Sequence, residues 1–310
     1  MKFAEQYYPE YLSHLSSVKS PQRALGAIIK KFYAKEIGAE PKDIYLVSIM
    51  PCTAKKFEAE REEFEGDADV VLTTREIVKI AKSTGINIRM VDPEPFDRPY
   101  GLSSQSGLSF GKSGGVLGRV ISVINEMVGI KNVETKELSE GVRLTTVELN
   151  NGKVVKGMAV FGLGNTRKIV DSIRSGELDV DIVEVMACNY GCIGGGGQPY
   201  PNDSRTREKR ARILKEVQSI DVLVSPTENF HMLQLYEKYL NKPLSREAHN
   251  VIHTHYKHRR RVQEDEIDIL PLPEDAEDKV KVSVCIGTSC YSKGSYEILE
   301  RLINAANKED

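Results

Sequence analysis

The pattern of apolar and polar positions alternates between helical and strand spacing along the first part of the chain. Residues 3–15 and 20–38 carry apolar side chains at helical spacing, and the proline of Ser20-Pro21 suits the first turn of the second helix. Residues 44–50 form a short, apolar, β-branched run, which predicts a strand buried on both faces. Residues 69–74 repeat that strand pattern. Helices alternating with short strands predict an α/β fold.

Turn and capping residues mark the next boundaries. A helix over 74–85 is expected to be capped by Thr73 or Thr74 and to end at a glycine. Residues 92–115 form a loop rich in Pro, Gly and Ser, which is longer than compact domains usually tolerate without a purpose. Alternating residues on both sides of Asn151-Gly152 predict a β-hairpin.

Two cysteines follow predicted strands. Cys52 comes after the strand over 44–50, and Cys188 comes after a second buried strand over 181–187, which a helix over about 165–175 precedes. Ligands of open α/β sheets gather beyond the carboxyl ends of the strands, so this placement predicts a shared site. Further helices are expected over 204–219, 229–240 and 245–261, with a short strand over 221–225.

Composition narrows the class of protein. The 310 residues are 40% hydrophobic and 28% charged, so the chain can bury a sizeable core. The net charge of -2 gives no general attraction to nucleic acid or to anionic membranes. No apolar stretch approaches the roughly 20 residues of a membrane span, and the first residues are too polar for a signal peptide. We therefore expect a cytoplasmic protein that has no membrane span and binds no nucleic acid.

The five cysteines form two close pairs and one single, at positions 52, 188, 192, 285 and 290. This spacing favours metal ligation or thiol chemistry in a reducing compartment over a disulfide framework. Four glycines follow Cys192 within the next residues, and they let backbone N–H groups approach an anionic group such as an iron-sulfur cluster. A zinc half-site, or two unconnected core thiols, is also compatible with the spacing alone. Lys55 adds a cation three residues after Cys52.

These stretches resemble the second and third signature motifs of the iron-only (FeFe) hydrogenases. Met50-Pro51-Cys52, with Lys55 and Glu58, matches the form M-P-C-x-x-K-x-x-E. The third motif is matched by Glu184, Met186, Cys188, Cys192, Gly195, Gly196, Gly197, Gln198 and Pro199. The resemblance extends over nearly the whole chain. It implies an α/β fold of two lobes, each a small twisted sheet with flanking helices, and a cofactor between the lobes.

The resemblance also implies a cofactor, the H-cluster, in which a 4Fe-4S cluster is joined to a diiron subcluster with carbon monoxide and cyanide ligands. Cys52, Cys188 and Cys192 would ligate the 4Fe-4S cluster, and Cys192 would also bridge to the diiron site. Lys55 would donate to a cyanide ligand. Met50 and Met186 would pack as apolar side chains against the carbon monoxide ligands, and Gln22 would lie against the diiron ligands. Ser16 would belong to the proton path. The remaining matched positions would line the cofactor: Pro51, Gly195, Gly196, Gly197 and Gln198.

The implied function is reversible heterolytic oxidation of dihydrogen, with electrons exchanged with ferredoxin or a partner subunit. The matched region predicts a catalytic domain over 1–262, incomplete at its amino end, with a small-subunit-like helical end over 203–262. A linker over 263–279 and an incomplete thioredoxin-like 2Fe-2S domain over 280–310 follow, and Cys285 and Cys290 resemble that domain's opening cysteine pair.

The central domain offers three thiolates where such a cluster takes four, because the family's first motif would precede Met1. Two explanations stay open, a fragment of a longer gene or a subunit whose missing cysteine comes from a neighbouring chain. A non-turnover iron-sulfur or sensory protein with the same fold is the alternative function.

Two other features have simpler interpretations. His253, His255 and His258 could bind a metal, but a solvated helix end is favoured for the segment that carries them. The glycine-rich stretch over 110–115 is similar to a phosphate cradle but lacks the Walker spacing, so nucleotide binding is disfavoured.

Overall fold

The structure is a computed structural model that describes residues 1–87, 89–97, 99–101, 104–220, 226–259, 301 and 304. The chain divides into two compact units, residues 1–15 with 256–310 and residues 16–255, each described here by itself. The predicted strand over 221–225, the linker over 263–279, and Cys285 and Cys290 lie outside the described residues.

In the first unit, the helix expected over 3–15 is interrupted. Helix α1 covers Lys2–Tyr7, and a 3-10 helix, η1, covers Pro9–His14. Pro9 lacks the N–H that an α-helix interior needs, which explains the break. The fully buried Glu5 carboxylate lies 3.8 Å from the guanidinium of Arg259, and this ion pair joins the two segments of the unit.

The second unit contains a small parallel sheet of strands β1 (Val47–Met50) and β2 (Val70–Thr73). Helices α4 (Ala54–Ala59) and α5 (Thr74–Ser83) pack against it. The strands lie where the sequence predicts them, but the expectation that the first is buried on both faces is wrong. Val47 and Ile49 are 45% and 53% exposed, because among the described strands β1 has one neighbour and one face of this sheet stays uncovered.

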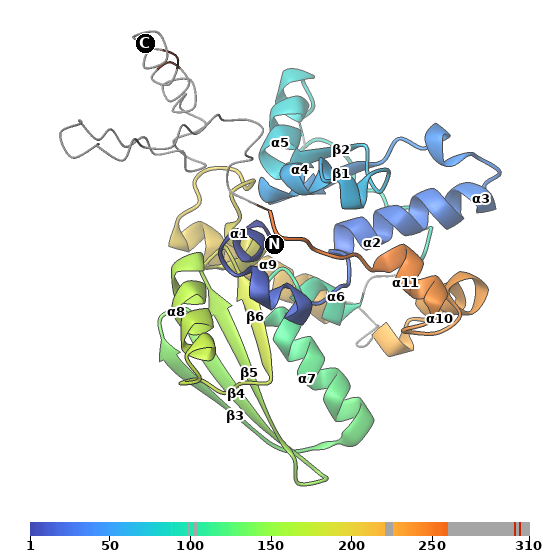
Figure 1. Cartoon of the computed structure of the whole chain (residues 1–310). Helices are drawn as coiled ribbons and strands as arrows, with labels where there is room; N and C mark the ends of the chain where they lie inside the picture. Colours follow the sequence, from blue (N-terminus) through green and yellow to red (C-terminus); the bar gives the residue numbers. More distant parts are fainter. Residues whose placement is uncertain are drawn as a thin grey trace. The chain divides into compact units, whose positions relative to one another are not determined.

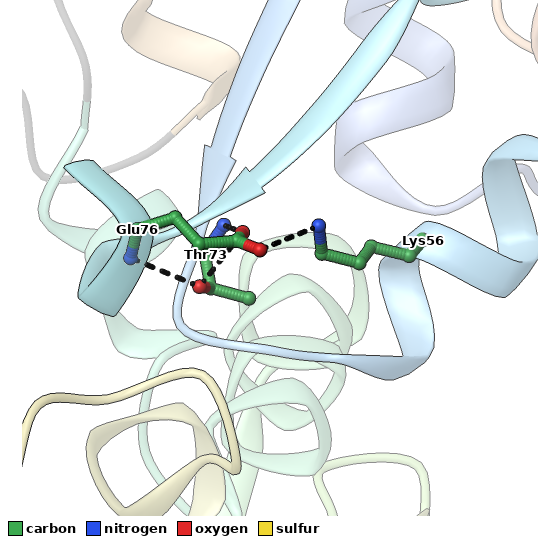
Figure 2. Close-up of polar contacts among 3 residues, drawn as sticks. All are labelled: Lys56, Thr73 and Glu76. Carbon is green, nitrogen blue, oxygen red and sulfur yellow. Dashed lines mark hydrogen bonds and ion pairs between the residues drawn. The ribbon is translucent and has the colours of Figure 1, made fainter. Parts of the chain in front are cut away.

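Helix α5 begins with the predicted cap. The Thr73 hydroxyl accepts a hydrogen bond from the N–H of Glu76, and the Glu76 carboxylate accepts one from the N–H of Thr73, which makes a capping box. The same carboxylate lies 3.0 Å from the ammonium of Lys56, and Figure 2 draws this contact as a dashed line. Since Lys56 lies on α4, this contact ties α4 to the start of α5.

The capping box predicts a pH-dependent stability. The hydrogen bonds from Thr73 and the ammonium of Lys56 lower the pKa of Glu76 from 4.5 to about 2. A depressed pKa stabilises the fold above the unfolded value, and this contribution is lost as the pH falls from 4.5 toward 2. Glu76→Gln is therefore expected to be less stable than wild type at neutral pH and as stable as wild type below about pH 2, where the wild-type carboxyl is also uncharged. Denaturant unfolding across this range checks it, with the exposed Glu137→Gln as control. A deficit independent of pH would contradict the assignment.

The larger sheet has the order β3-β4-β5-β6, formed by Ile130–Ser139, Val142–Leu149, Val154–Phe161 and Ile182–Met186. Neighbouring strands are antiparallel, except that β5 and β6 are parallel. Strands β4 and β5 form the predicted hairpin. Helix α7 (Gly115–Val128) covers one face of the sheet and α8 (Leu163–Arg174) covers the other (Figure 1).

The strand buried on both faces is β5. Ala159 and Phe161 pack toward Leu117 of α7, whereas Met158 and Val160 pack toward Ile169 of α8. Strand β6 was expected to be buried in the same way, but it pairs with β5 alone among the described strands, and its Val185 is 45% exposed. Helix α7 and strand β3 were not predicted, since the glycines before α7 hide its start and β3 is largely polar and exposed.

A helical cluster completes the second unit. The predicted helix over 20–38 is a continuous helical run, α2 (Pro21–Ile28), a π-helix (Ile29–Tyr33) and α3 (Ala34–Glu36). Its Ala27 and Phe32 pack with Leu240 and Val251 from the later helices. The remaining helical elements are η3 (Pro41–Asp43), η4 (Glu62–Phe64), α6 (Gln105–Ser109), η5 (Gly191–Gly194), α9 (Ser204–Ile220), η6 (Pro226–Glu228), α10 (Phe230–Leu235), η7 (Tyr236–Leu240) and α11 (Arg246–Ile252).

Helix α11 ends earlier than the helix expected over 245–261. His253 is extended and forms an isolated β-bridge with Val18, and its ring Nδ1 lies 2.8 Å from the Ser17 hydroxyl. The solvated helix end that the sequence favoured is therefore wrong at His253, because the backbone leaves the helix to pair with residues 17–19. Among the described residues, no helix has the length and apolar content to cross a membrane.

Candidate metal centre

Two loops that follow parallel-paired strands meet in the second unit. Cys52 comes two residues after β1, and Cys188 comes two residues after β6. Cys192 lies in η5, within the glycine-rich loop. The N–H of Gly197 donates to the carbonyl of Pro51 at 3.0 Å, so the two cysteine loops, far apart in sequence, are joined through their backbones. The shared site predicted from strand ends is formed by these two loops.

Glycine is required where the loops touch. A Cβ added at Gly195 would lie 2.1 Å from the carbonyl oxygen of Pro51, and one added at Gly197 would lie 2.7 Å from the backbone nitrogen of Cys52. A Cβ at Gly196 would meet Thr53 at an ordinary 3.4 Å. The close approach of the backbones therefore depends on Gly195 and Gly197 but not on Gly196.

The three described thiols influence one another electrostatically. Burial, and then the charge of Cys52, raises the pKa of Cys188, and an N–H of Gly196 lowers it. Burial raises the pKa of Cys192 most, Cys52 and Cys188 raise it further, and the ammonium of Lys55 lowers it. Three half-buried thiols beside a lysine are a set that binds cationic metal in the thiolate form, with release of protons.

The spacing of these thiols bears on the kind of metal group. Within the described ranges, no group of three or more His, Cys, Asp or Glu side chains could hold a single metal ion. In a 4Fe-4S cluster each cysteine binds a different iron, and thiolates are the usual ligands. Three cysteines on two joined loops fit this ligand type. The described residues supply three of the four thiolates that such a cluster takes.

Two arginines hold the glycine-rich loop, and sequence analysis did not identify them. Arg75, on α5, donates to the carbonyls of Gly196 and Gln198. Arg210, on α9, donates to the carbonyls of Ile193 and Pro199, at 3.1 and 2.9 Å. In the sequence both arginines occupy polar positions of amphipathic helices, which gives no signal that distinguishes them from solvated charges.

The side chains of Gln198 and Glu184 form hydrogen bonds that stabilise the loops around the site. The Gln198 amide donates to the carbonyl of Cys192 at 3.2 Å, which fixes the turn after that cysteine. The buried Glu184 carboxylate accepts hydrogen bonds from the N–H groups of Gly114 and Leu117, at 2.9 and 2.7 Å. The amino end of α7, which was similar to a phosphate cradle in sequence, is thus capped by a carboxylate of this chain.

Polar groups without partners lie near the start of α2. Both amide atoms of Gln22 and the hydroxyl of Ser20 are buried and have no hydrogen-bond partner among the described residues. Buried polar groups are normally satisfied, so these atoms are available to hydrogen-bond a bound group. Lys55 pairs with Glu58 three residues on, and both side chains are largely buried.

The other residues predicted for the site lie on several elements of the second unit. Met50 ends β1, opposite Thr73 of β2. The Met186 side chain packs against the buried cluster of Leu117, Ala159 and Phe161. Ser16 is exposed, and its hydroxyl accepts from the N–H of Val18 at 3.4 Å. Pro51 joins the cysteine loops through its carbonyl.

Comparison with known protein families gives two adjoining matches. The family described as "Iron only hydrogenase large subunit, C-terminal domain" matches residues 1–196, and the family described as "Iron hydrogenase small subunit" matches residues 203–259.

Individual relatives are of two kinds. The chain is 38% identical over 272 residues to the NADP-reducing hydrogenase subunit HndD of Solidesulfovibrio fructosivorans, an alignment that covers 84% of this chain and 46% of the relative. It is 30% identical over 272 residues to the cytosolic Fe-S cluster assembly factor narfl of Xenopus tropicalis, covering 82% and 56% of the two chains. The chain thus spans about half the length of the curated relatives it matches.

A solved structure shares the fold. A variant of the apo FeFe-hydrogenase HydA1 from Chlamydomonas reinhardtii superposes with a TM-score of 0.72 at 31% sequence identity, covering 83% of this chain and 73% of that one. This likeness confirms the predicted α/β class with small sheets flanked by helices.

Proposed function

The chain belongs to the iron-only hydrogenase large-subunit family, and from this premise we propose that it is a hydrogenase catalytic chain. The proposed reaction is the reversible heterolytic oxidation of dihydrogen to protons and electrons. The observation that carries the proposal is the hydrogen bond from the N–H of Gly197 to the carbonyl of Pro51, which brings the loop of Cys52 against the loop of Cys188 and Cys192. The proposed cofactor is the H-cluster, which, when bound, supplies the redox-active irons and the open position where dihydrogen is split.

Cys52, Cys188 and Cys192 are the proposed thiolate ligands of the 4Fe-4S part, and Cys192 is the proposed bridge to the diiron part. Gly195 and Gly197 let the two loops approach, while Pro51, Gly196 and Gln198 shape the loop surface around the thiols. The fourth thiolate is not among the described residues. We propose that it comes from a further segment of this polypeptide or from a neighbouring chain.

The residues around the diiron part would act by charge and exclusion of water. Lys55 would donate to a cyanide ligand, because an ammonium in a half-buried site makes a strong charge-assisted hydrogen bond. Gln22, whose buried amide has no partner, would lie against the diiron ligands. Met50 and Met186 would supply apolar walls, although Met186 also packs into the sheet core. Ser16 would carry protons.

Isotope exchange tests the proposed activity. Full-length chain, produced with the machinery that assembles the diiron site, is expected to form HD from deuterium gas in ordinary water, and Cys192→Ser is expected to form none. This assay needs no electron partner, so it tests the heterolytic step by itself. A chain that carries the diiron part but forms no HD would contradict the proposal.

A second candidate is a non-turnover iron-sulfur or sensory protein, which the 30% identity to a cluster assembly factor favours. This candidate predicts at most about four irons per chain and no HD, even after coexpression with the assembly machinery.

The proposed electron partner is ferredoxin or another redox subunit. The proposed location is the cytoplasm, since the three described cysteines are free thiols and a reducing compartment keeps them so. The domain divisions at 262 and 279, and a 2Fe-2S role for Cys285 and Cys290, also remain proposals.

A further inference from the structure

Arg23 is a fully buried charge that has no partner in the part of the chain that the structure describes. It lies in the first turn of α2, its side chain is 0% exposed, and Nε, Nη1 and Nη2 have no hydrogen-bond partner among the described residues. The ring of Phe64 lies 5.9 Å from the guanidinium carbon and covers it without satisfying its N–H groups. A buried guanidinium with all its donors free is costly, so such a residue normally has an anionic partner in some state of the protein.

Two carboxylates lie within electrostatic range of Arg23. Burial lowers the pKa of Arg23, and Glu58 and then Asp67 raise it. Each carboxylate already has a cation. Lys19 lies 2.8 Å from Asp67, with side chains 11% and 9% exposed, and Lys55 pairs with Glu58, with side chains 21% and 17% exposed.

The charges therefore do not balance. Among the described residues, three cations, Lys19, Arg23 and Lys55, face two anions, Glu58 and Asp67, in a region largely closed to water. The surplus is one positive charge, which calls for one additional small anion. Lys55 is the cation next to the cysteine loops, because it lies in the first turn of α4, three residues after Cys52. The anion is therefore expected on the Lys55 side of the group.

We propose that Arg23 is a positioning residue that takes over the Glu58 carboxylate when Lys55 turns to an anionic ligand of the metal centre. The proposal rests on the proposed function only for the identity of that anion. Glu58 is the carboxylate that exchanges its cation. The Lys19–Asp67 ion pair is less exposed than the Lys55–Glu58 ion pair, so Lys19 and Asp67 stay together. Arg23 thereby keeps Glu58 from competing for Lys55 once the ligand is bound.

The exchange can be tested without any metal. Lys55→Met leaves Glu58 free, which reproduces the state in which Arg23 should be engaged. In the metal-free full chain, Arg23→Gln is expected to raise the folding equilibrium constant by about tenfold, because it removes a buried charge that has no described partner. In the Lys55→Met background the same change is expected to lower the constant by about 100-fold, because it leaves a buried carboxylate unpaired.

Denaturant unfolding of the four proteins gives the coupling between the two changes. The exposed Arg205→Gln is the matched control and is expected to act equally in both backgrounds. An equal effect of Arg23→Gln in both backgrounds would overturn the proposal. If Lys55→Met does not fold, Lys55→Gln replaces it and leaves Glu58 free in the same way. In that background Arg23→Gln is again expected to lower the constant, and an effect equal to the one in the wild-type background would overturn the proposal.

Protein that carries the diiron part tests whether the exchange is linked to the metal centre. In the chain carrying the diiron part, Arg23→Gln is expected to shift the cyanide infrared bands, because Glu58 again competes for Lys55, whereas Arg205→Gln is expected to leave them in place. Unshifted bands in Arg23→Gln would overturn the proposal. Absence of cyanide bands from the wild-type chain would instead overturn the proposed function, and the metal-free cycle would still decide the role of Arg23.

Discussion

Cys192→Ser is expected to remove the iron centre from the chain. Cys192 is the proposed ligand of both parts of the cofactor, and its backbone is held on both sides, with the carbonyl of Gly111 accepting its N–H at 3.1 Å and Gln198 donating to its carbonyl. A serine hydroxyl keeps this backbone arrangement but is a poor iron ligand. Anaerobic reconstitution is therefore expected to give about four irons per wild-type chain and almost none per variant chain.

Ser175→Ala is a control for this loss, because Ser175 is exposed at the end of α8 and its hydroxyl donates to the carbonyl of Ser172. It is expected to bind as much iron as the wild type. A Cys192→Ser chain that retained a visible-absorbing cluster with full iron content would show that this thiol is not a ligand.

Gly195→Ala is expected to force the two cysteine loops apart. The added Cβ would lie 2.1 Å from the Pro51 carbonyl oxygen, and neither backbone can move aside without breaking the Gly197 to Pro51 hydrogen bond. Overpacking of this kind costs up to about 3 kcal/mol of folding free energy, and here the displaced atoms carry the metal ligands. Loss of most cluster binding should accompany the loss of stability.

Gly196→Ala is the matched control, since position 196 is exposed and its added Cβ would make an ordinary contact. Thermal unfolding and iron content of the two variants, measured side by side, separate the effect of the clash from the effect of losing a glycine. Equal behaviour of the two variants would contradict the loop contact on which the site depends.

Local signals in the sequence predicted much of the fold. Thr73 is a capping residue whose partner lies three positions on, Asn151-Gly152 specifies its own turn, and Cys52 and Cys188 follow recognisable strands. Each of these depends on residues close in sequence, where propensity and hydrogen-bonding chemistry act directly.

Features that depend on distant segments were not predictable. The burial of a strand depends on how many neighbours it has. The apolar sequences of β1 and β6 therefore predicted strands buried on both faces, although each has one described partner strand. Arg210 and Arg23 look alike in sequence, yet one holds a loop from α9 and the other is enclosed without a partner. Their roles follow from packing between segments, which the order of residues alone does not reveal.

Infrared spectroscopy of the full-length chain, produced with the assembly machinery for the diiron site, tests the central claim most directly. Carbon monoxide and cyanide bands are expected in the wild type, with the cyanide bands shifted in Lys55→Met and all bands absent in Cys192→Ser. A wild-type chain without these bands, or a Cys192→Ser chain that keeps them, would contradict the claim that the two cysteine loops hold one iron centre beside Lys55.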